Sequence, residues 1–187
     1  MTSQRDPRVD CYVTGNRKWA SSEGFKPPID FSQIRKWTRE SAEGQCYIVA
    51  CSDPRCCPEE YLGMTPSNKA GALRVAGGRV QNALSSLYVL TAVGTHGRTG
   101  TIMVIHHTDC GMCYLTDEDI RESLRSRLPE GCPEAKEIDL MSFGCINDPE
   151  QTVRIDVEFL KASPYFKGMQ VFGFVQDIHT GLLKEIA

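Results

Sequence analysis

Four short apolar runs, separated by amphipathic segments, dominate the hydrophobic pattern of the chain. The runs cover residues 46–50, 72–76, 101–105 and 170–176. Each has the length of a strand, and a continuous apolar run is typical of a strand buried on both faces. Between them, apolar residues recur at helical spacing over 80–91 and 153–160. Strands that alternate with helices predict an α/β domain with a mainly parallel sheet flanked by helices.

Capping residues indicate where several helices begin. Asp30 or Ser32 can cap a helix over 30–43, in which Phe31 and Ile34 share a face. Further start signals are Pro58, Thr116 and the pair Asp148-Pro149. A Gly-rich turn is expected over 94–100. Thr180-Gly181 predicts a hairpin into a short antiparallel edge strand over 182–186.

The first part of the chain lacks such a pattern. Residues 1–28 are polar, and Pro27-Pro28 end the segment, so we expect it to be irregular. With 187 residues in all, the length fits one domain. The expected organisation is an N-terminal arm over 1–30 and a single catalytic domain over 31–187.

Composition and charge exclude several classes of protein. Hydrophobic residues make up 41% and charged residues 24% of the chain, as in ordinary globular proteins. A net charge of −3 without a long basic tract does not favour nucleic acid as a partner. The sequence has no apolar run long enough for a transmembrane helix and no readable signal peptide. We therefore expect a cytoplasmic protein that binds neither membranes nor nucleic acid.

Nine cysteines stand out in this composition. The number is odd and no secretory signal precedes them, so a disulfide framework is a poor interpretation. In a reducing compartment, cysteines near His and Asp indicate metal or catalytic chemistry. Many of the nine can also be small buried apolar residues.

Metal-binding residue types gather where two of the predicted strands end. Cys51 follows the first apolar run, and His107 and Cys110 follow the third. Carboxyl ends of parallel strands lie at one edge of a sheet, where ligands bind. Two thiolates and one imidazole leave a fourth position open, as in a catalytic zinc site. Side chains alternate along a strand, so His106 is expected to support His107 rather than to bind the metal.

The spacing leaves the roles of Cys113, Asp53 and Arg55 open. Cys113 follows Cys110 as a CxxC pair and could close a structural zinc site or form a redox pair. Asp53 could take the fourth metal position. Alternatively, Asp53 could accept a hydrogen bond from a metal-bound hydroxide while Arg55 holds it ionised and oriented.

These motifs resemble the β-class carbonic anhydrases. The pattern Cys51-x-Asp53-x-Arg55 followed by His107-x-x-Cys110 is similar to the metal motifs of that family. The stretch 104–112 is similar to its compact members in nearly every position, and 73–78 and 171–184 add to the likeness, which covers 44–187. Val75 departs from the family, which usually has Asn there.

The resemblance implies one Zn²⁺ per chain on Cys51, His107 and Cys110, and a catalytic dyad of Asp53 and Arg55. It implies the strand order 2-1-3-4 and a homodimer or higher oligomer whose pocket is formed partly by the second subunit. Gly111 is a candidate for substrate binding. So is Gln45, because plant-like members use a Gln near the pocket, before the first strand.

The reaction that the resemblance implies is the reversible hydration of carbon dioxide to bicarbonate and a proton through zinc-bound hydroxide. Two thiolates neutralise the charge of the metal, so activity is expected to rise toward alkaline pH. Carbonyl sulfide and carbon disulfide are linear like carbon dioxide, and some relatives hydrolyse them, which leaves that alternative open. A non-catalytic zinc-binding module is a further alternative.

Overall fold

The computed structural model describes residues 6–40, 44–64, 70–94 and 100–187. The chain divides into two compact units, Met1–Ile34 and Arg35–Ala187. The second unit contains the sheet and all the predicted site residues. Most of the Gly-rich turn expected over 94–100 and the end of the helix expected over 30–43 lie outside the described residues.

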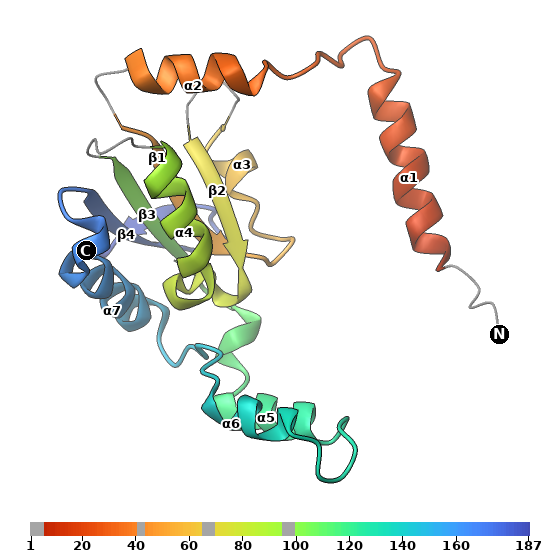
Figure 1. The fold of residues 1–187 in the computed structure, drawn as a ribbon, viewed down its shortest axis with the longest axis vertical. Helices are drawn as coiled ribbons and strands as arrows, with labels where there is room; N and C mark the ends of the chain where they lie inside the picture. Colours follow the sequence, from red (N-terminus) through yellow and green to blue (C-terminus); the bar gives the residue numbers. More distant parts are fainter. Residues whose placement is uncertain (1–5, 41–43, 65–69, 95–99) are drawn as a thin grey trace. The chain divides into compact units, whose positions relative to one another are not determined.

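The described residues form one five-stranded sheet in the order β2-β1-β3-β4-β5 (Figure 1). Its strands are β1 (Cys46–Cys51), β2 (Ala70–Val75), β3 (Thr101–His107), β4 (Gln170–Gln176) and β5 (Leu183–Glu185). The first four pair in parallel, and β5 runs antiparallel to β4. The predicted α/β class, the order 2-1-3-4 and the antiparallel edge strand are confirmed.

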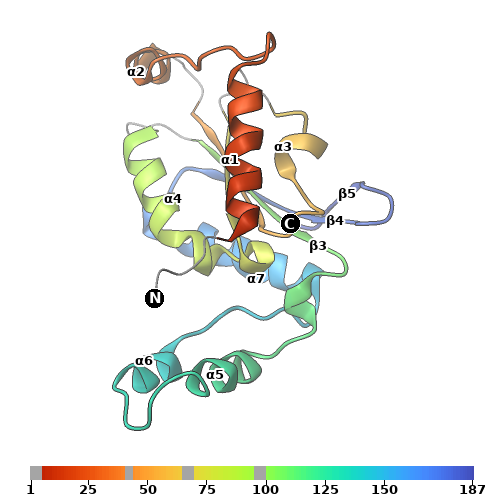
Figure 2. The same ribbon diagram turned by 90° about the vertical axis from the view of Figure 1, so that its right-hand side faces the viewer.

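Two long helices cover one face of this sheet. They are α4 (Val80–Gly94) and α7 (Pro149–Ala162), seen beside the strands in Figures 1 and 2. Apolar residues at helical spacing, such as Leu87 and Val153, pack there against strand residues such as Val49 and Val104. On the other face, residues around α3 (Pro58–Tyr61) pack against Ile48 and Ile105. The sheet is therefore buried on both faces, as its continuous apolar strands predict.

The strand β3 is two residues longer than its apolar run. His106 and His107 continue the strand because they pair with Val175 and Gln176 of β4. Both histidines are buried, with exposed fractions of 0% and 2%. Backbone pairing with β4 thus carries two polar side chains into the interior at the carboxyl end of the sheet.

Apart from the N-terminal segment, the remaining described elements are short. They are α2 (Phe31–Glu40), α5 (Asp117–Arg125), α6 (Glu134–Leu140), η2 (Ala76–Gly78), η3 (Gly111–Cys113) and η4 (Pro164–Phe166). Thr116 caps α5 with a full capping box to Asp119, and the Asp148 side chain accepts a hydrogen bond at the start of α7, as the sequence predicts. No helix of the described residues is long and apolar enough to cross a membrane.

The N-terminal segment is not irregular, and that expectation is wrong. Residues Pro7–Ala20 form the helix α1. The Asp6 side chain accepts a hydrogen bond from the Arg8 backbone N–H at 2.9 Å, and Pro7 occupies the first turn, where its missing N–H costs nothing. The helix buries none of its residues, and its few apolar residues, such as Val9, Tyr12 and Val13, stand among polar ones.

A glycine on the α7 side of β4 leaves no room for a methyl group. A Cβ on Gly173 would lie 2.4 Å from Val153 Cγ1 and 2.9 Å from Val157 Cγ2. Gly173→Ala is therefore expected to lower the free energy of unfolding by about 1–3 kcal/mol, measured by urea denaturation. Gly71→Ala in β2 is the control, because its Cβ would meet its nearest neighbour, Tyr47 Cδ1, at 3.8 Å. Equal losses in the two variants would contradict this packing argument.

Candidate metal centre

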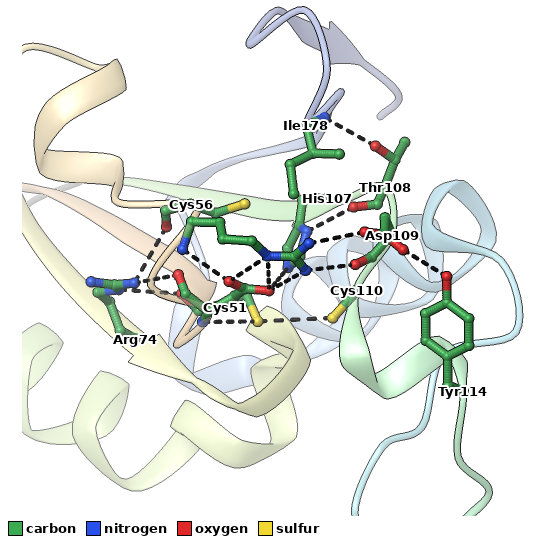
Figure 3. Close-up of polar contacts among 11 residues, drawn as sticks. Cys51, Cys56, Arg74, His107, Thr108, Asp109, Cys110, Tyr114 and Ile178 are labelled. Carbon is green, nitrogen blue, oxygen red and sulfur yellow. Dashed lines mark hydrogen bonds and ion pairs between the residues drawn. The ribbon is translucent and has the colours of Figure 1, made fainter.

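Two strand ends bring Cys51, His107 and Cys110 together. Cys51 is the last residue of β1, His107 is the last residue of the neighbouring β3, and Cys110 follows one turn later. One ligand atom from each of the three lies within 4.8 Å of the others. All three residues are buried, and the two Sγ atoms are 3.8 Å apart. The sequence predicts this grouping, and Figure 3 shows the two sulfurs facing each other.

The hydrogen bonds of His107 leave one of its nitrogens available. Its Nδ1 lies 2.8 Å from the Thr108 carbonyl oxygen, which only accepts, so Nδ1 carries the proton. Its Nε2 is buried without a hydrogen-bond partner among the described residues. A buried nitrogen lone pair beside two thiols is a costly arrangement unless something binds there. Sulfur and imidazole nitrogen are ligands that suit Zn²⁺, so this group could hold such an ion.

The two thiols share a hydrogen bond that separates their acidities. The contact with Cys110 lowers the pKa of the Cys51 thiol, assisted by His107. The same contact, together with burial, raises the pKa of the Cys110 thiol. One thiolate is therefore favoured even without a metal, and a bound cation would favour the second.

Asp53 and Arg55 lie on the loop that follows β1. The Arg55 guanidinium donates to both Asp53 carboxylate oxygens, with Nη2 2.7 Å from Oδ2 and Nε 3.1 Å from Oδ1. The Arg55 backbone N–H adds a bond of 2.9 Å to Oδ1. These contacts lower the pKa of Asp53 to about 2. Asp53 Oδ2 lies 3.9 Å from His107 Nε2, so this ionised carboxylate borders the candidate centre.

The alternatives with a fourth protein ligand find no support in this geometry. Neither Asp53 nor Cys113 belongs to the group of converging ligand atoms. The Asp53 carboxylate is engaged by Arg55, and Cys113 packs at the side of the pair Cys51 and Cys110. The arrangement is a three-ligand group with a carboxylate next to it.

His106 belongs to a different network, as strand alternation predicts. Its Nδ1 lies 2.9 Å from Thr152 Oγ1, and its Nε2 lies 3.4 Å from Asp156 Oδ2. Asp156 also receives two hydrogen bonds from the buried Arg79 guanidinium, at 2.9 and 3.0 Å. Arg79 and Asp156 were not among the residues predicted from the sequence. The available signal is that Asp156, three residues after Val153, falls on the inner face of its helix.

Close backbone packing holds the two strand ends together. Gly78 has a φ of +66°, and a Cβ there would lie 2.8 Å from the Ile105 carbonyl oxygen and 3.0 Å from the Cys51 nitrogen. Only glycine combines this conformation with such an approach. Ile146, which is 1% exposed, packs with Cys51 and Cys110. One side of the sulfur pair therefore lies against apolar side chains.

Two further predicted residues lie apart from this group. Gly111 is exposed at the start of η3, directly after Cys110. Gln45 precedes β1, so the whole strand of about 20 Å separates it from Cys51. It accepts a hydrogen bond from the Tyr47 hydroxyl at 3.1 Å. Within one copy of the chain, the structure does not bring Gln45 to the candidate centre.

The acidity of Asp53 depends on Arg55, and this can be tested. Its pKa in the folded chain lies below the ordinary value of about 3.9, so its ionised form stabilises the fold above that pH. This contribution is lost as the pH falls toward about 2. Arg55→Gln is expected to return the pKa toward about 3.9. A ¹³C NMR titration from about pH 3 to 6 should show a carboxyl step for Asp53 in the variant and none in the unmodified chain.

The control for this titration is Arg8→Gln. Arg8 pairs with Asp6 at the start of α1, so its replacement removes an arginine–aspartate pair other than that of Asp53. If the Asp53 carboxyl titrates between about pH 3 and 6 in neither variant, or in both, that result contradicts the assigned role of Arg55.

Comparison with known proteins gives a consistent result. The family model described as "Carbonic anhydrase" matches residues 46–183. Beta-carbonic anhydrase 1 of Mycobacterium tuberculosis is 29% identical over 184 residues, which cover 95% of this chain and 97% of that protein. A carbon disulfide hydrolase of Acidithiobacillus thiooxidans is 24% identical over 173 residues, which cover 83% of this chain and 86% of the relative.

A solved structure supports the same relationship. The carbonic anhydrase of Streptococcus mutans superposes with a TM-score of 0.70 at 26% identity, over 98% of this chain and 100% of that one. The matched region contains the strands β1 to β4 and the three residues of the candidate centre. The chain belongs to the β-carbonic anhydrase family.

Proposed function

We propose that the chain catalyses the zinc-dependent, reversible hydration of carbon dioxide to bicarbonate and a proton. The observation that carries this proposal is the buried Cys51-His107-Cys110 group with an ionised Asp53 beside it. The relatives named beta-carbonic anhydrase support the choice of reaction. One Zn²⁺ per chain would be held by the two Sγ atoms and by His107 Nε2. When bound, zinc supplies the Lewis acidity that activates water as a nucleophile.

Asp53 orients the attacking water in this proposal. Its pKa of about 2 keeps the carboxylate ionised at working pH, so it accepts a hydrogen bond and carries no proton. This bond aims an oxygen lone pair at the substrate carbon. Arg55 holds the carboxylate in place through its paired contacts.

The surroundings suit a small apolar substrate. Met112 and Ile146 pack against the cysteine pair and give that side of the centre an apolar lining. Gly111 is proposed to contact substrate at the exposed side, where a Cβ would meet nothing within 4 Å. Gln45 lies at the far end of β1, so its proposed contact is with the site of a second copy of the chain.

Hydrolysis of carbon disulfide or carbonyl sulfide is the second candidate, favoured by relatives that are named carbon disulfide hydrolases. The experiment compares the zinc-loaded chain with each substrate at equal concentration. Proton release from carbon dioxide is followed by stopped-flow, and hydrogen sulfide release from the sulfur substrates by a thiol-trapping dye. We expect carbon dioxide to give the higher kcat/KM. A higher value for either sulfur substrate would overturn the first assignment.

We further propose that the chain acts as a homodimer or higher oligomer. Val89 and Val93 of α4 are 62% and 50% exposed, and Val89 borders a hollow of about 380 Å³ beside Leu73 and Leu90. Exposed apolar patches mark interaction surfaces.

The catalytic domain is proposed to span 31–187, with 1–30 as an arm. A cytoplasmic location is proposed because all nine cysteines are free thiols.

A further inference from the structure

The guanidinium of Arg55 is shared by two carboxylates. Besides Asp53, it contacts Asp109 on the loop after β3, with Nη1 2.9 Å from Oδ2 and Nη2 3.0 Å from the backbone carbonyl oxygen. Figure 3 shows Asp109 beside Tyr114, on the segment that carries Cys110. Arg55 therefore connects the loop that carries Asp53 to the loop that carries Cys110.

Asp109 is itself fixed from several sides. The Tyr114 hydroxyl donates to Asp109 Oδ1 at 2.6 Å, on the oxygen that Arg55 leaves free. Asp109 has a φ of +54°, which is uncommon for a residue other than glycine and needs support from its surroundings. On its other side, the Thr108 hydroxyl accepts a hydrogen bond from the Ile178 backbone N–H at 3.0 Å. The loop between His107 and Cys110 is thus anchored in one geometry.

We propose that Tyr114 is a positioning residue that acts through Asp109, so that the two residues form a latch that fixes Arg55 on Asp53. The latch rests on the proposed function, in which Asp53 orients the nucleophile. Asp53 needs a fixed direction as well as a negative charge. A guanidinium held only by Asp53 can rotate together with the carboxylate. A guanidinium anchored on a second loop restricts that rotation.

The contribution of this latch is to orientation rather than to stability. The Arg55 and Asp109 side chains are 51% and 41% exposed, and ion pairs with such exposure add little to folding. Tyr114 is 73% exposed, so removing its hydroxyl buries no unpaired group. A Tyr114→Phe chain is therefore expected to keep its zinc and to change its melting temperature by no more than about 2 °C.

The test uses the zinc-loaded full chain, labelled with ¹⁵N-arginine. The Arg55 Nε–H signal, assigned by its loss in Arg55→Lys, reports how fast that proton exchanges with water. Tyr114→Phe is expected to speed this exchange and to lower kcat, each by about 3- to 10-fold, with KM unchanged. Asp109→Asn tolerates the same backbone conformation but loses the charge, and it should speed the exchange similarly. Tyr165→Phe is the matched control, because Tyr165 is also 73% exposed and contacts the ring of Tyr88 instead.

The outcomes separate the latch from the proposed function. Faster Arg55 exchange in Tyr114→Phe and not in Tyr165→Phe supports the latch, even if the unmodified chain has no turnover and the proposed function fails. Unchanged exchange in both Tyr114→Phe and Asp109→Asn overturns the latch, even if carbon dioxide turnover is fast. Equal acceleration in Tyr114→Phe and Tyr165→Phe also overturns it.

Discussion

Cys51→Ser is expected to release zinc and to lower carbon dioxide turnover by more than about 100-fold. Cys51 supplies one of the two buried sulfur atoms of the candidate centre, 3.8 Å from the other. Changes in residues that only support metal ligands cost about 10- to 100-fold, so the loss of a ligand itself should cost more. Metal content by mass spectrometry and turnover by stopped-flow give the two readouts.

Cys113→Ser is the matched control for this change. Cys113 forms a CxxC pair with Cys110 and packs at the side of the cysteine cluster, but it lies outside the group of ligand atoms. Its replacement should leave one zinc per chain in place and turnover within about 2-fold. Zinc loss in Cys113→Ser would instead indicate a closed structural site.

Asp53→Asn is expected to keep zinc and to lose about 100-fold in kcat. The amide has the size of the carboxylate, but it lacks the charge that pairs with Arg55 and accepts the hydrogen bond of the attacking water. Removing a group that acts on the reacting atoms typically costs about 10² or more in rate. Stopped-flow hydration of carbon dioxide measures the loss, and metal analysis confirms that zinc remains.

Asp139→Asn is the control for Asp53→Asn. Asp139 also pairs with an arginine, Arg125, but it lies on α6, away from the candidate centre. This variant should turn over normally. Full activity in Asp53→Asn would refute the orienting role of Asp53, and zinc loss in Asp53→Asn would show that Asp53 is a metal ligand.

The local pattern of apolar residues in the sequence predicts the strands. Continuous apolar runs give β1, β3 and β4 to within two residues, because burial on both faces removes the need for polar positions. The last two residues of β3, His106 and His107, lie outside its apolar run. These two histidines are polar, and only pairing with β4 keeps them in the strand.

Residue spacing and sheet topology are enough to predict the grouping of the candidate ligands. Parallel strands whose ends carry Cys51 and His107 must place both at one edge of the sheet. Spacing and topology do not predict the contact between Arg55 and Asp109. It joins residues 54 positions apart, and it depends on the unusual backbone conformation of Asp109, which no composition or periodicity encodes.

Two other features were not predicted from the sequence, for different reasons. The helix α1 has a cap at Asp6, but its few apolar residues stand among polar ones, and none of them is buried. The buried pair of Arg79 and Asp156 joins positions 77 apart. Charged residues are usually assigned to the surface, and only their mutual pairing makes burial tolerable here.

The most direct test of the account is carbon dioxide hydration as a function of zinc occupancy. Zinc is removed from the chain with a chelator and returned in steps, and stopped-flow turnover near pH 8.5 is recorded at each step. The account predicts that turnover is absent without zinc and rises in proportion to occupancy, reaching its maximum at about one zinc per chain. Full occupancy of the Cys51-His107-Cys110 group without turnover, or turnover that does not depend on zinc, would contradict it.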